Sequence, residues 1–344
     1  MIFILFLLSR SWSEEYLTIG TELIIRVLGD PFITNLQKVI NMTGEKLERP
    51  SLAGSWLASL LHSPHNTDCF DHWRYAQQNI TEIPDPENHR KDFDDLNSTL
   101  GKLNDVILNG KLNGPWPYNF GFKVFLTLYL ESFDPIHITE YFDNDSFKDG
   151  DYNGRKFFIK FKGRNMSLHD FWGTGCGKYV LETPYNSTGW KEIENATTNL
   201  YNKMTESRYS YFNISHTYDD AIKESKAYSK RYVYNLSLIQ KDIELPEEYI
   251  STCEYLTTKR MLQAANLVAI RLKKFVVPDM PKIKPIPNVR SSEIIAWGIF
   301  FLVAPVTAYL GWKLCDAVIH SEVEGIKDET VEKMKSDDND EPSV

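Results

Sequence analysis

A run of 19 residues without a charge, at positions 294–312, sets the strongest limit on how this chain can fold. Such a run is long enough to cross a bilayer as one helix, and Trp297, Tyr309 and Trp312 suit the two interfaces. The internal Pro305 is tolerated in membrane helices. We therefore expect a transmembrane helix at 294–312, with a buried helix of a soluble domain as the alternative.

The N-terminus has the features of a short signal peptide at residues 1–11. Residues 2–8 are apolar, and Ser9 and Ser11 are small residues placed for a cut before Trp12. A misplaced start codon or a strand is the alternative. With the later apolar run, this predicts a single-pass type I protein whose large domain lies outside the cytosol. The outer flank of the run is more basic than the inner one, against the usual bias, but a translocated folded domain overrides flank charges.

Asparagine-linked glycosylation sequons support this topology. Nine are present, all before the apolar run, at Asn41, Asn79, Asn97, Asn144, Asn165, Asn186, Asn195, Asn213 and Asn235. We expect an ectodomain at 12–276, a proline-rich stalk at 277–293, the membrane helix at 294–312 and a cytosolic tail at 313–344. The tail has four basic and ten acidic residues. The protein would lie at the cell surface or in an endomembrane.

The four cysteines suggest one disulfide. Cys69, Cys176 and Cys253 lie in the expected ectodomain, which permits one bond and leaves one thiol, and the pairing is open. Cys315, beside the inner membrane edge, is a weak candidate for palmitoylation.

Apolar residues at helical spacing dominate the ectodomain. They mark stripes over 96–107, 122–131 and 261–272, whereas residues 155–162 are β-prone and flanked by glycines, as in a hairpin strand. The sequence therefore predicts a mainly α domain with a small β-hairpin. The net charge is −9, so the chain lacks the excess of basic residues that is typical of a dedicated nucleic-acid-binding protein.

Several short motifs follow one another in a distinctive order. They are Gly54-Ser-Trp-Leu-Ala58, Pro135-Ile-His137, Gly150-Asp-Tyr-Asn-Gly154, Ser167-Leu-His169 with Trp172, Glu224-Ser225 and Val233-Tyr234. This order resembles the zinc-dependent single-strand nucleases, the family of mung bean nuclease and the kinetoplastid 3′-nucleotidase/nucleases, with zinc phospholipase C as a distant relative. The resemblance covers most of residues 12–272. It implies a mainly α-helical fold and three zinc ions held in a cleft.

Most of the metal ligands that the resemblance implies are replaced. The positions of five ligands hold Leu17, Ala58, Arg74, Thr127 and Gly173. The aspartate expected where Ala58 stands also orients the attacking water in these nucleases. Leucine, alanine and glycine side chains offer no donor to zinc, and arginine would place a cation where a dication belongs.

Four implied ligands remain: the Trp12 backbone, Glu131, His137 and His169. Two histidines and a carboxylate would hold one zinc, with Asp151 or Asp170 completing the site. Alternatively, His137 and His169 are leftover polar residues in a reduced cleft. A further alternative is a polar cluster at His62, His65, Asp68, Asp71 and His72, in which His72 would replace the histidine missing at Arg74.

The favoured reading is a membrane-anchored pseudo-nuclease that binds or serves a structural role, with no catalytic residue and no zinc. The alternative is a residual nuclease or 3′-nucleotidase with at most one zinc, acting on single-stranded nucleic acid or nucleotides. A third reading is a helical surface glycoprotein unrelated to the family.

Overall fold

The computed structural model describes residues 13–43, 47–60, 68–76, 78–81, 94–109, 114–180, 185–206, 217–273 and 313. The signal peptide, stalk, membrane run and nearly all of the tail expected from the sequence lie outside these residues, as does Trp12. The chain divides into two compact units, residues 1–283 and 284–344, and the fold described below is that of the first unit. Within the described residues, no helix combines the length and apolarity needed to cross a bilayer.

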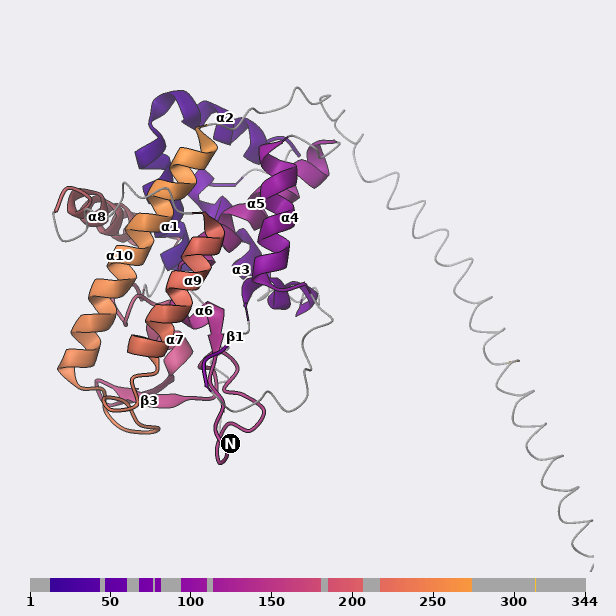
Figure 1. Ribbon diagram of the computed structural model, residues 1–344. Helices are drawn as coiled ribbons and strands as arrows, with labels where there is room; N and C mark the ends of the chain where they lie inside the picture. The colour runs from indigo at the N-terminus through magenta and orange to yellow at the C-terminus, as the bar shows by residue number, and fades with distance from the viewer. Residues whose placement is uncertain are drawn as a thin grey trace, which may run out of the picture. The chain divides into compact units, whose positions relative to one another are not determined.

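The domain is mainly helical, as the apolar stripes predict (Figure 1). Its α-helices are α1 (Glu14–Leu28), α2 (Asp30–Ile40), α3 (Trp56–Leu60), α4 (Leu96–Leu108), α5 (Pro115–Glu131), α6 (Pro135–Ile138), α7 (Leu168–Gly173), α8 (Ser187–Lys203), α9 (Tyr218–Tyr228) and α10 (Glu247–Leu272). Short 3-10 helices occur at η1 (Pro50–Ala53) and η2 (Asp68–Arg74), and η5 (Ser229–Val233) is a π-helical turn after α9.

Helix α5 forms the centre of the larger hydrophobic core. Pro115 starts it at a position where the missing backbone N–H costs no hydrogen bond, and every residue from Gly121 to Glu131 is buried. Helices α1, α2, α3, α4 and α10 pack around it. Because α5 is enclosed on all sides, polar groups on it must find partners inside the protein, and this enclosure positions the candidate site at its C-terminal end.

The β structure consists of two pairs of short strands. β3 (Phe158–Phe161) and β4 (Arg164–Ser167) form an antiparallel hairpin, and Lys162 and Gly163 at its turn have left-handed backbone angles. The strand expected at 155–162 is thus shorter than predicted, because residues 152–155 form a turn and the strand begins only at Phe158. β1 (Gln78–Asn79) pairs in parallel with β2 (Thr139–Glu140), which joins the segment after η2 to the end of α6.

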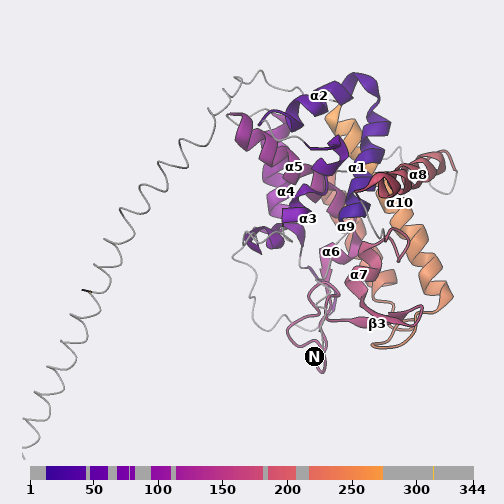
Figure 2. The ribbon, with the colours of Figure 1, turned by 180° about the vertical axis from the view of Figure 1, so that it is seen from behind.

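A second, smaller core lies under the hairpin, α7, η5 and the first half of α10. The disulfide joins Cys176, after α7, to Cys253 in α10, so the pairing left open by the sequence is Cys176 with Cys253. Figure 2, seen from behind, also shows α7 and β3 near the N-terminal end of α10. The bond fixes the segment carrying α7 to the longest helix of the domain.

Candidate functional site

Two histidines from different parts of the chain meet below the end of α5. The Asp134 side chain caps α6 by accepting a hydrogen bond from the Ile136 backbone, and this cap places His137 in the core. Ser167 caps α7 in the same way and places His169. The two imidazole rings stack with centroids 5.4 Å apart. His137 Nδ1 lies 4.0 Å from Glu131 Oε2, so the last residue of α5 joins the cluster.

Arg74, at the end of η2, contacts the same carboxylate. Its Nε donates to Glu131 Oε1 at 2.8 Å, its Nη2 donates to the same oxygen, and both side chains are almost fully buried. Burial acts to lower the pKa of Arg74, but Glu131, Tyr75 and Asp71 together outweigh burial and the pKa lies above its ordinary value. Arg74 is therefore a fixed cation inside the cluster.

Both histidines are held in one tautomer. His137 Nδ1 lies 3.0 Å from the Arg74 carbonyl oxygen, and His169 Nδ1 lies 2.8 Å from that of Asn153. A carbonyl only accepts, so each Nδ1 carries the proton and each Nε2 presents a lone pair. Burial is the main cause that lowers the pKa of His169 to about 3 and that of His137 well below its ordinary value. Both rings are neutral at physiological pH.

A layer of polar side chains covers one side of the histidine pair. The Tyr75 ring lies 4.7 Å from the ring of His137 and 5.9 Å from that of His169, centroid to centroid. The Arg155 guanidinium lies 4.5 Å from the centre of the Tyr75 ring and donates to the Tyr75 hydroxyl. It also donates to both carboxylate oxygens of Asp71, at 3.1 and 3.3 Å. This layer ties η2 to the turn at residues 150–155.

The replaced ligand positions are filled by packing. Leu17 and Ala58 are buried in the larger hydrophobic core. The Thr127 hydroxyl donates to the Gly54 carbonyl at 2.7 Å, and it faces the backbone that precedes α3. Gly54 itself has no room for a side chain, because an added Cβ would lie 1.8 Å from Thr21 Oγ1. The Gly173 carbonyl accepts a hydrogen bond from the Ser13 backbone at 2.9 Å.

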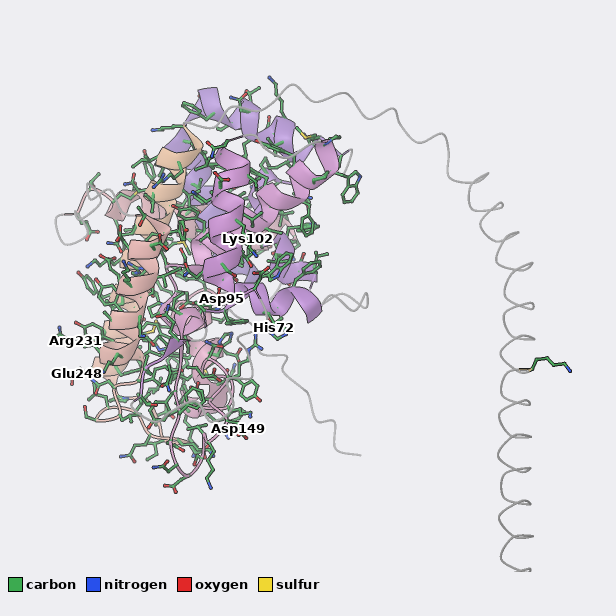
Figure 3. The ribbon with its side chains drawn as sticks, turned by 45° about the vertical axis from the view of Figure 1, so that its right-hand side comes forward. His72, Asp95, Lys102, Asp149, Arg231 and Glu248 are labelled. Atoms are coloured by element: carbon green, nitrogen blue, oxygen red, sulfur yellow. A yellow bond between two sulfur atoms is a disulfide. The ribbon has the colours of Figure 1, made fainter. Side chains whose placement is uncertain are left out.

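The further ligands considered from the sequence do not join the histidine pair. Asp151 accepts from the Tyr141 backbone at 3.1 Å and from the Tyr234 hydroxyl at 2.6 Å, so its two oxygens are engaged within the smaller core. Asp170 is half-buried in the first turn of α7. His72 is exposed, as Figure 3 also shows, whereas Arg74 is the η2 residue that contacts Glu131. His62 and His65 lie outside the described residues.

The donor set does not fit a group of zinc ions. Among the described ranges, no three or more His, Cys, Asp or Glu side chains are placed to hold a metal ion. Glu131 Oε1 receives two hydrogen bonds from a guanidinium, which also repels a dication. One feature favours a metal: His169 Nε2 is buried and has no hydrogen-bond partner within the described part of the chain. The lone pairs of two imidazoles are too few for a zinc site, which needs about four donors.

Sequence reasoning missed three of the residues that shape this cluster. Asp134 was detectable from the sequence, because an aspartate followed by a proline is typical of the start of a helix. In the structure, burial raises the pKa of the Asp134 carboxyl well above its ordinary value. His137 Nε2 lies 3.7 Å from Asp134 Oδ2. Tyr75 and Arg155 carry no such local signal, because their contacts join segments about 80 residues apart.

The comparisons with known proteins give one match. The model of the S1/P1 Nuclease family matches residues 34–276, which is more than half of the chain. Leu17 precedes the matched range, whereas the histidine pair, Glu131 and Arg74 all lie within it. A comparison with curated proteins finds no match.

Proposed function

The chain belongs to the S1/P1 nuclease family, and from that premise we propose that it is a membrane-anchored pseudo-nuclease. Its ectodomain would keep the family fold for binding or for a structural role, without hydrolysing phosphodiesters. The observation that carries this proposal is the buried ion pair between Arg74 and Glu131. The Arg74 guanidinium binds the Glu131 carboxylate, which would otherwise be available to coordinate a metal ion.

The chemistry of zinc hydrolases explains why this pair matters. Such enzymes generate hydroxide on a bound metal and stabilise the charge that develops on phosphate oxygens, and each metal needs about four donors. Leu17, Ala58 and Gly173 supply no donor side chain, and the Thr127 hydroxyl donates to a carbonyl. The aspartate that would orient water is absent at Ala58. These substitutions remove both the metal charge and the general base.

A reduced metal site is the second candidate function. The bare Nε2 of His169 favours it, because a buried lone pair without a donor suits a metal better than a hydrophobic core. In that case Glu131, His137 and His169 would hold one zinc, and the protein would be a slow phosphoesterase or 3′-nucleotidase; the Trp12 backbone, which the family resemblance adds as a ligand, lies outside the described residues. Arg74 would first have to move away from Glu131, and the stabilisation from the buried ion pair would be lost.

The proposed location is a membrane, in a single-pass type I arrangement with the ectodomain outside the cytosol. The uncharged run at 294–312 and the signal-like residues 1–11 support it. The sequons add support: of the eight sequon asparagines that lie in described ranges, six are exposed, Asn79 and Asn235 are half-buried, and none is buried. A disulfide between Cys176 and Cys253 also suits an oxidising compartment.

Zinc content and turnover test the proposal together. Full-length protein, purified in detergent and equilibrated with excess zinc, is analysed for bound metal after removal of free zinc. It is then incubated with single-stranded DNA, RNA and 3′-nucleotides. We expect no stoichiometric zinc and no turnover above a buffer control. One zinc per chain, with activity that His169→Ala abolishes, would establish the second candidate function instead.

A further inference from the structure

A set of solvent-accessible cations lies on α9, η5 and α10, outside the buried cluster around the histidine pair. Lys223 and Lys226 lie on α9, Lys230 and Arg231 lie on η5, and Lys259 of α10 is adjacent; we call these five residues the basic face. The spacing of the three α9 and η5 lysines, three and four residues apart, brings them to one side of the helix. They span roughly 10 Å along its axis.

Four of these cations are free to meet a ligand. Lys223, Lys226, Lys230 and Arg231 form no ion pair with any carboxylate in the described ranges. The carboxylate within the same stretch, Glu224, is directed to Arg260 of α10, whose Nη1 lies 2.7 Å from Glu224 Oε2. The basic face therefore keeps four cations without a described ion pair, although Asp219 and Asp220 lie one turn before Lys223. Glu247 and Glu248 begin α10 and set its border, and Figure 3 marks Glu248 and Arg231 at the same edge.

Two tyrosines contact two of these cations, Arg231 and Lys259. The rings of Tyr228 and Tyr232 lie 6.0 Å apart, and the Arg231 guanidinium lies 5.2 Å from the centre of the Tyr232 ring. Lys259 Nζ donates to the Tyr228 hydroxyl at 3.1 Å, and the buried Arg260 guanidinium lies 5.4 Å from the Tyr228 ring. Cation–π contacts of this kind restrict the side chains before any ligand arrives.

The distribution of sequons leaves this face uncovered. Neither α9, η5 nor α10 contains a sequon, whereas α4, α8 and β4 carry sequons at exposed asparagines. Asn235, two residues beyond the end of η5, is the nearest in sequence. In a glycosylated ectodomain, no glycan would be attached to the helices that carry the basic face, and the glycan at Asn235 would lie beyond its Arg231 end.

We propose that the basic face binds a linear sulfated polysaccharide. Lysine is a compact, hydrated point charge that suits sulfate groups spaced along a flexible chain. Single-stranded nucleic acid is disfavoured because it needs aromatic ring faces on which bases stack. Here the Tyr228 and Tyr232 rings are occupied by each other and by protein cations. Within the described ranges, no hydrogen bond, ion pair or ring contact joins the cations of α9 and η5 to Arg74 or the histidine pair, so binding at this face can be tested separately from the metal question.

Heparin is the probe for the test, with full-length protein in detergent at physiological salt. The triple variant Lys223→Gln, Lys226→Gln and Lys230→Gln removes three charges from the basic face. The control variant Lys148→Gln, Lys160→Gln and Lys178→Gln removes three exposed charges elsewhere. We expect the first variant to bind heparin roughly ten- to a hundredfold more weakly and the control to bind within about twofold of wild type.

Three outcomes overturn the proposal. The first is absence of heparin binding by the wild-type protein at physiological salt, and the second is an equal loss in both triple variants. The third is a tighter complex with a single-stranded oligonucleotide of matched charge, which would make the basic face a nucleic-acid site. Circular dichroism of each variant shows whether a loss reflects unfolding, and Arg231→Gln provides a single substitution if the triple variant does not fold.

Discussion

Arg74 Nε and Glu131 Oε1 lie 2.8 Å apart in the interior of the domain, where an η2 side chain meets the last residue of α5. In the proposed function, this pair takes the place of the attraction between a metal and its carboxylate, and it needs no ion from solution. It also fixes η2 to the central helix, and the Arg74 carbonyl orients His137. Arg74 thus contributes to the packing of η2 and, in the proposed function, occupies the carboxylate that a metal would bind.

Removing the Arg74 side chain should strongly destabilise the domain. Arg74→Ala leaves the Glu131 carboxylate buried without its cation, for which a loss of about 3–5 kcal/mol in the free energy of unfolding is expected. The double variant Arg74→Met with Glu131→Leu removes both charges and should be closer to wild type. Denaturant unfolding of the three proteins measures the difference. An Arg74→Ala variant as stable as wild type would show that the pair is not important for folding.

Replacing Arg74 by histidine should restore zinc binding. Arg74→His releases Glu131 and adds an imidazole beside His137 and His169, which provides the four donors that one zinc needs. Isothermal titration should detect about one zinc per chain, whereas Arg74→Lys, which keeps a cation there, should bind none. Turnover should remain absent, because Ala58 still lacks the general base. Equal zinc binding by both variants would contradict the assignment of position 74.

The metal-free protein should become less stable as the pH is lowered below about 6.5. The folded state keeps His169 neutral with a pKa of about 3, whereas the unfolded chain takes up its proton near pH 6.5. Acid therefore favours unfolding between these two values, by about 1.4 kcal/mol per pH unit for each such histidine. His169→Gln should flatten the pH dependence measured by urea unfolding. Leu126→Ala, a core change without a titrating group, should lower stability but keep the wild-type slope.

The disulfide between Cys176 and Cys253 should contribute measurably to stability. It closes a loop with a sequence separation of 77 residues, and its loss should cost about 2–4 kcal/mol. Thermal melts of the variant Cys176→Ser with Cys253→Ser should match those of reduced wild-type protein. Cys69→Ser serves as the control and should retain the shift of the melting temperature on adding reductant.

The membrane arrangement predicts a defined pattern of glycosylation and protection. Glycosidase treatment should increase the gel mobility by several glycans, and protease added to sealed vesicles should remove only residues 313–344. An unglycosylated chain that is fully digested from the cytosolic side would contradict the type I topology. Substituting Asn235 alone should remove one glycan and no more.

The helices were largely predictable, whereas the cluster around Glu131 was predictable only in part. The apolar stripe at 261–272 is the buried end of α10, but the helix begins earlier, at Glu247, after Pro246. Periodicity missed this first half because it packs against the smaller core through aromatic neighbours and Cys253. The family motifs indicated that Arg74 stands at a ligand position. They did not indicate that its guanidinium would contact Glu131, because that contact depends on how η2 packs against α5.

The layer of Asp71, Tyr75 and Arg155 was beyond sequence reasoning for a similar reason. Its members meet across a separation of about 80 residues, and each alone is an ordinary polar residue. The parallel pairing of β1 with β2 involves two residues on each strand, which is too short for a period-2 pattern.

The contact between Thr127 and Gly54 has a consequence for the history of such a chain. The threonine hydroxyl lies 2.7 Å from a carbonyl on a backbone segment that is itself pressed against Thr21. A histidine at position 127 would need the space that this backbone fills, so a single reversion there would cost packing before it offered a ligand. At position 74 a single substitution could introduce a histidine ligand, whereas at position 127 the segment before α3 would have to move first. If the chain descends from a zinc enzyme, as the proposed function implies, restoring a histidine at position 127 therefore requires more rearrangement than restoring one at position 74.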